Sequence, residues 1–169
     1  MEALQIFGGN SMLTKGKFVG FTDNGIKVFD RNDNHSSVHP VAEGILKEAL
    51  LHISTCEDYV KETINFGRII GKTTCVKVDN TDTIIMARRK GRKGPTPLVL
   101  GRTAEDCSSL VVILRKCDDG DYILVTYFIG ILSEREPWDP AIIPGSAEEQ
   151  RAITFWNTHA LIYDERIVA

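Results

Sequence analysis

The segment Leu110–Ile129, LVVILRKCDDGDYILVTYFI, contains two apolar runs separated by a polar turn. The runs Leu110–Lys116 and Tyr122–Ile129 are rich in β-branched and aromatic residues, which favour strands. Cys117–Asp121 contains a glycine and three aspartates, a composition typical of a tight turn. Because a short turn can join only antiparallel strands, the segment predicts a β-hairpin. Uninterrupted apolar runs such as Leu110–Leu114 indicate strands that are covered on both faces.

Further strand patterns precede this hairpin. Phe66–Val78 predicts a strand bent near Gly71, Thr83–Arg89 predicts the next strand, and Leu98–Leu100 predicts a short third one. The connections between these segments are short, and parallel pairing would need long crossovers. The middle of the chain therefore predicts an antiparallel β-meander.

Three helices are predicted around the strands. Pro40–Ile53 has apolar residues at a spacing of three to four, and Thr55 as a cap predicts a second helix that buries Val60 and Ile64. Ser146 followed three residues later by Glu149 is typical of a capping box at the start of a last helix. We expect the residues 159–163 after that helix to form a short extended segment.

The first residues predict a separate hairpin. Phe18–Phe21 and Ile26–Phe29 flank an Asn-Gly turn, and a polar loop follows. Residues 1–35 are therefore a possible N-terminal appendage to a core of residues 36–169. The predicted fold is a single α+β domain in which N-terminal helices pack on an antiparallel meander, with a C-terminal helix.

Composition excludes several classes of protein. The chain has 169 residues and 43% apolar residues, with no run long enough to cross a bilayer and no signal peptide pattern, so we expect a soluble cytoplasmic protein. Its four cysteines contain no Cys-x-x-Cys pair, and reduced, mostly buried thiols are expected unless the protein is exported with two disulfides. Zinc, Walker and nucleophile-elbow motifs are absent, so we expect no metal and no cofactor.

Charge is unevenly distributed along the chain. The net charge is −3, yet residues 84–104 contain six basic and no acidic residues, whereas residues 105–169 contain 5 basic and 12 acidic residues. Such a basic patch attracts phosphates. The candidate nucleic-acid-binding residues are Arg88, Arg89, Lys90, Arg92, Lys93 and Arg102. The alternative is a solvated loop that the acidic C-terminal third balances.

Two further features could carry chemistry. His159 lies at the predicted boundary between a helix and an extended segment, where a histidine can exchange protons near neutral pH. The loop Glu134–Asp139 combines three carboxylates, an arginine and Trp138. A packed structural histidine, and a loop fastened by Trp138, are the alternatives.

The layout of residues 40–130 resembles the barnase, EndoU, colicin and RelE group of small ribonucleases, common among bacterial toxins. The resemblance lies in the helix Pro40–Ile53, the strand start Arg68–Thr73 and the closing strand Ile123–Tyr127. It implies an α+β fold and cleavage of RNA without a metal. By position, the implied catalytic residues besides His159 are Arg68, Lys72, Thr126 and Tyr127. No histidine stands at the start of the sheet, which departs from the pattern of the group.

Two functional hypotheses follow from these patterns. The first is an RNA-binding or metal-independent RNA-cleaving domain, in which Lys72, Arg88 and Arg89 would stabilise a charged phosphorane. The second is a non-catalytic protein-interaction or regulatory module, for which the acidic flank is the motivation. RNA and a protein are thus both possible partners, a membrane is not expected, and the oligomeric state stays open.

Overall fold

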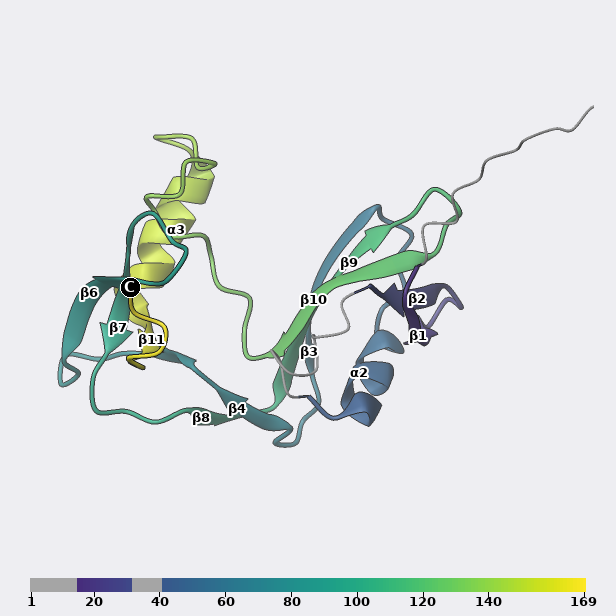
Figure 1. Cartoon of the computed structure of the whole chain (residues 1–169), viewed down its shortest axis with the longest axis horizontal. Coiled ribbons are helices and arrows are strands. Elements are labelled where there is room, and N and C mark those ends of the chain that lie inside the picture. The colour runs from purple at the N-terminus through teal and green to yellow at the C-terminus, as the bar shows by residue number, and fades with distance from the viewer. Residues whose placement is uncertain (1–14, 32–40) are drawn as a thin grey trace, which may run out of the picture. The chain divides into compact units, whose positions relative to one another are not determined.

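The computed structural model describes residues 15–31 and 41–169, and its elements are shown in Figure 1. This part of the chain contains eleven strands in three sheets and two short helices. The strands are β1 Lys17–Phe21, β2 Lys27–Asp30, β3 Tyr59–Asn65, β4 Gly71–Thr73, β5 Cys75–Lys77, β6 Ile84–Arg88, β7 Pro95–Val99, β8 Glu105–Cys107, β9 Ser109–Lys116, β10 Tyr122–Ile129 and β11 His159–Ile162. The helices are α2 Glu43–Leu50 and α3 Ala147–Thr158. The fold is therefore mostly β.

The sheets do not form the predicted meander. The five-stranded sheet has the order β1-β2-β10-β9-β3, the four-stranded sheet the order β5-β11-β7-β6, and β4 pairs with β8. Two of these pairings are parallel, β2 with β10 and β7 with β11. Each joins strands that are distant in the sequence, so local turn signals could not have revealed them.

The predicted α+β fold with N-terminal helices packed on a meander is wrong. The segment expected to form the second helix contains strand β3, in which Val60 and Ile64 are buried. These two positions are four apart, a spacing that one face of a strand and one face of a helix share. Pairing with β9 decides in favour of the strand. The first predicted helix shortens to the eight residues of α2, whereas the C-terminal helix is confirmed.

The described chain divides into two compact units. The first unit comprises the residues up to Val60 together with Ile113–Thr126. In it, α2 buries Leu46, Ala49 and Leu50, and Gly20 of β1 faces Leu50. The predicted N-terminal hairpin is confirmed as β1 and β2, with Gly25 at a φ of 80° in its turn.

The second unit comprises Lys61–Val112 and Tyr127–Ala169. Strand β11 lies between β5 and β7, and a small core of Val76, Val99 and Ala160 forms where these strands meet. Helix α3 precedes β11 directly, and its N-cap is Ser146, whose hydroxyl accepts a hydrogen bond from the Glu149 amide at 3.2 Å. The predicted Ser146 cap and the extended segment are therefore confirmed, while the Glu149 carboxylate accepts from the amide of Gly145 and not from that of Ser146 as in a full capping box.

The last residues of the chain cover part of the edge strand β6. The amide of Lys90 donates to the carbonyl of Ile167 at 2.8 Å, and the amide of Ala169 donates to the carbonyl of Arg88 at 2.9 Å. A β-bridge joins Arg89 and Val168. An open strand edge can pair with other chains. Residues 167–169 therefore protect the end of β6 that leads into the loop 89–94.

Within the described residues, no helix is long and apolar enough to cross a membrane. The four cysteines are free thiols, of which Cys56 is exposed and the other three are partly buried. Burial raises the pKa of the Cys75 thiol to about 11, although the nearby Arg89 acts in the opposite direction.

We expect deletion of residues 146–169 to unfold the second unit. The deletion removes α3 and β11, and without β11 the strands β5 and β7 have no common neighbour. The truncated protein should be insoluble, or should unfold in urea with a reduced slope because less surface is buried. Urea titration followed by circular dichroism tests this. An unchanged midpoint and slope would show that these elements are peripheral.

We expect the thiols to react at very different rates with an alkylating reagent. With its pKa raised to about 11, only about one in a thousand Cys75 side chains is a thiolate at pH 8. Exposed Cys56 should therefore be modified first, and Cys75 only when the pH approaches 11 or the protein unfolds. Mass spectrometry of peptides after timed alkylation gives the order. Early modification of Cys75 in folded protein at pH 8 would contradict the expected burial.

Candidate nucleic-acid interface

The loop between β6 and β7 displays exposed cations. Arg88 ends β6, Pro95 begins β7, and Gly91 turns the chain with a φ of 74°. The exposed cations of this hairpin, which we call the basic tip, are Arg88, Lys90, Arg92 and Lys93. No described residue forms an ion pair with any of the four. The basic tip therefore gathers four exposed cations that form no ion pair with a described residue, with Lys90 in electrostatic reach of Asp164 and Arg92 beside the carboxylates of the pocket described below.

Arg89 differs from its neighbours because its side chain is engaged inside the protein. Its Nη2 donates to Oε1 of Glu136, and its Nε donates to the hydroxyl of Thr96 at 3.3 Å. The same hydroxyl donates to Oε1 of Glu136 at 3.0 Å. Only 8% of the Glu136 side chain is exposed, against 21% for Arg89. A buried carboxylate needs such partners, so we assign Arg89 a structural role.

The segment 134–139 is fastened to the sheet and to helix α3 by both tryptophans. Nε1 of Trp138 donates to the carbonyl of Pro95 at 2.6 Å, and Nε1 of Trp156 donates to the carbonyls of Glu134 and Arg135 at 3.0 and 3.1 Å. With the Glu136 network, these contacts fix the segment against the base of the hairpin. The sequence-based alternative of a loop fastened by Trp138 describes its role well.

Two pockets flank Glu136 and Trp156. A polar pocket of about 300 Å³ is lined by Arg89, Arg92, Ser133, Glu134, Arg135, Glu136, Asp139, Trp156 and Leu161. A second pocket of about 330 Å³, the apolar groove, is lined by Met86, Pro95, Pro97, Glu136, Pro137, Trp138, Ile153, Trp156 and Asn157. Both belong to the second unit. The loop singled out in the sequence thus contributes to both.

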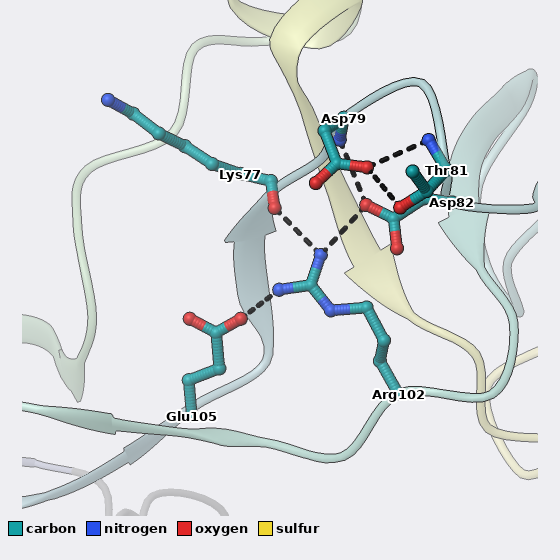
Figure 2. A network of polar contacts seen from close by, with 6 residues as sticks. All are labelled: Lys77, Asp79, Thr81, Asp82, Arg102 and Glu105. Carbon is teal, nitrogen blue, oxygen red and sulfur yellow. Dashed lines mark hydrogen bonds and ion pairs between the residues drawn. The ribbon is translucent and has the colours of Figure 1, made fainter.

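Arg102, in contrast, lies in a closed polar network of its own (Figure 2). Its Nη1 donates to the carbonyl of Lys77 at 2.8 Å and to Oδ2 of Asp82 at 3.1 Å, and its Nη2 donates to Oε1 of Glu105. Hydrogen bonds from Thr81 stabilise the neighbouring Asp79 carboxylate and lower its pKa. With its guanidinium engaged in this way, Arg102 is not part of the basic tip.

His159 is held by the end of helix α3. The residue is 9% exposed, its ring stacks on Phe155 with centroids 4.2 Å apart, and its Nδ1 lies 2.9 Å from the hydroxyl of Thr158. Nδ1 is also 3.1 Å from the carbonyl oxygen of Phe155. His159 lines neither of the two pockets described above. These contacts match the packed histidine that the sequence left as an alternative.

None of the remaining catalytic candidates lines the polar pocket or the apolar groove. Lys72 on β4 pairs with Asp106 on β8 at 2.8 Å, and the guanidinium of Arg68 lies over the ring of Phe66. Thr126 belongs to the first unit, and Tyr127 is a buried residue of the second.

Sequence reasoning missed the partner of Arg89. Glu136 lies 47 positions away, beyond the reach of any local pattern. The residue types of the loop pointed to the segment 134–139 but not to the contact of Glu136 with Arg89.

No protein-family model matches this chain, and no curated protein sequence matches it. Among solved structures, it is similar to the crystal structure of a conserved hypothetical protein from Toxoplasma gondii ME49. The two share 9% sequence identity and a TM-score of 0.48, with 75% of this chain and 86% of that chain covered. A likeness this distant carries no argument about fold or function. The chemistry of the interface has to be inferred from its own residues.

We expect Glu136→Ala to destabilise the second unit. Removing the carboxylate leaves Arg89 without its anionic partner, and breaking a buried pair costs about 3–5 kcal/mol. Because Arg89 is partly exposed, we expect a loss near the lower end, at about 3 kcal/mol. Urea denaturation measures it.

Glu134→Ala is the matched control. Its carboxylate is much more exposed and lies 3.7 Å from Arg151, so less than about 1 kcal/mol should be lost. Equal effects of the two substitutions would contradict the assigned role of Glu136.

Proposed function

We propose that this chain binds a nucleic acid, with RNA the expected one, through the basic tip. The observation that carries the proposal is the exposure of Arg88, Lys90, Arg92 and Lys93 on one short hairpin loop. No acidic residue stands between positions 84 and 104, so nothing in the loop itself offsets this charge. Phosphate groups at regular spacing are the polyanion that such a cluster attracts.

Two of the six basic residues of residues 84–104 are excluded from this surface. Arg89 and Arg102 already donate to carboxylates of their own chain. Their partners Glu136 and Asp82 are largely buried, with 8% and 13% of the side chains exposed, so a guanidinium that leaves them for a phosphate gains little net energy. Binding is therefore assigned to the remaining four cations, and at most four phosphate contacts are expected.

The proposal covers binding and not cleavage. Proton transfer needs an acid or base that can reach the reacting oxygen. His159 is packed against Phe155, and Lys72 is paired with Asp106. RNA cleavage by these residues thus stays a prediction from the sequence resemblance. A non-catalytic protein-interaction module stays the alternative function.

The salt dependence of binding tests the proposal. Each phosphate contact to a single strand contributes about −0.7 to the slope of log affinity against log salt, so four contacts give a slope of about −3. The triple substitution Arg88→Ala, Arg92→Ala and Lys93→Ala should reduce the slope by about 2 units. Fluorescence anisotropy with a labelled oligoribonucleotide at several salt concentrations measures both values.

A matched triple substitution controls for the loss of net charge. Lys17, Lys27 and Lys47 are exposed residues of the first unit, and their replacement by alanine removes the same three charges. This control should retain nearly the full slope. If both triple variants lose affinity equally, or if the wild-type protein binds neither RNA nor heparin, the basic tip is not a nucleic-acid site.

A further inference from the structure

The apolar groove adjoins the basic tip through Trp138. A Cβ added to Gly94, the residue that follows the four cations, would lie 2.4 Å from Cδ2 of Trp138. The indole therefore packs directly on the backbone of the loop, and its Nε1 is bonded to the carbonyl of Pro95. These two contacts fix an aromatic ring beside a cluster of cations.

The register of β6 and β7 places a cation on the same face as the groove. Met86 pairs with Pro97 and Arg88 pairs with Pro95, and paired residues present their side chains on one face of a sheet. Met86, Pro95 and Pro97 all line the groove. Arg88 follows Met86 on that face at a distance of about 7 Å along the strand. An anion bound to Arg88 would thus lie next to the groove.

The groove also offers a few polar groups. Both hydrogen bonds that described residues donate to the Glu136 carboxylate end on Oε1, so they leave Oε2 available. The exposed Asn157 of α3 adds an amide, which can both donate and accept. A matching ligand combines a flat apolar body with hydrogen-bond donors at its edge and a negative charge nearby.

We propose that the nucleic acid bound by the basic tip is single-stranded and that one unpaired base enters the apolar groove. This inference rests on the proposed function, because phosphates on the tip bring the base to the groove. The ring of the base lies against Trp138, and its polar edge faces Glu136 and Asn157. Proteins that bind single strands combine cations for the backbone with aromatic platforms for the bases in this way.

A base fits these groups better than an apolar peptide side chain does. An aliphatic side chain would cover Oε2 of Glu136 without offering that oxygen a hydrogen-bond donor, whereas the Arg89 and Thr96 bonds already satisfy Oε1. The amino and imino groups of bases are donors. A base within a duplex is stacked and paired, and therefore cannot enter the groove.

Probes with and without bases separate the contribution of phosphate contacts to affinity from the contribution of a base in the groove. We would compare a single-stranded oligoribonucleotide, a duplex of the same length and heparin, for wild type, Trp138→Ala and Trp138→Phe. Loss of stacking should weaken single-strand binding by about tenfold in Trp138→Ala, while Trp138→Phe retains most of it. Affinity for heparin should stay the same in all three proteins. Ile143→Ala, an exposed apolar residue outside both pockets, is the control.

Two measurements guard against a folding defect in Trp138→Ala. Met86 is 61% exposed, so Met86→Ala should fold normally and still weaken single-strand binding by about threefold. In the wild-type protein, the oligoribonucleotide should quench tryptophan fluorescence and heparin should not.

Several outcomes would overturn the inference while the proposed function stands. One is that Trp138→Ala loses affinity for RNA and for heparin by the same factor, or loses affinity for neither. Another is equal affinity for duplex and single strand. Tighter binding of an acidic peptide than of RNA, lost in Trp138→Ala, would assign the groove to a protein partner. Failure of the wild-type protein to bind either heparin or RNA would instead remove the proposed function itself.

Discussion

The ion pair between Arg89 and the buried carboxylate of Glu136 is the contact on which the candidate interface depends. It joins the hairpin of β6 and β7 to the segment 134–139, and the hydroxyl of Thr96 completes it. Once this segment is fixed, Trp138 reaches the loop backbone at Gly94 and Pro95. The apolar groove and the position of the basic tip beside it both follow. A polar contact inside the protein thus shapes an apolar surface.

The same constraint divides the basic residues into two groups. Arg89 and Arg102 are paired with the largely buried carboxylates of Glu136 and Asp82. The four cations of the basic tip are exposed and form no ion pair with any residue that the structure describes. A desolvated ion pair does not readily exchange one partner for the phosphate of a ligand, because the carboxylate left behind would be buried without an opposite charge. Exposed cations lose only water and counterions, and release of counterions from the nucleic acid favours binding. Burial, more than residue type, therefore separates structural from binding residues.

Local signals predicted the elements whose stabilising contacts are themselves local. The turn at 117–121 predicted β9 and β10, and the capping box predicted α3, because a turn or a cap involves residues only a few positions apart. The helix predicted after Thr55 was wrong because Val60 and Ile64 fit either a strand or a helix, and pairing with β9 chose the strand. The α+β fold that the ribonuclease resemblance implies is wrong, because the described chain consists mostly of strands in three sheets.

The sequence alone determined the hairpins, the last helix and the concentration of positive charge in residues 84–104, since each depends on neighbouring residues. Only the tertiary structure decided the order of the sheets, the parallel pairing of β11 with β7 and the pairing of Arg89 with Glu136. These contacts join residues tens of positions apart, so their energies depend on which surfaces meet in the folded chain. The same holds for the groove beside the basic tip, which exists because Trp138 packs on Gly94 across 44 positions of sequence.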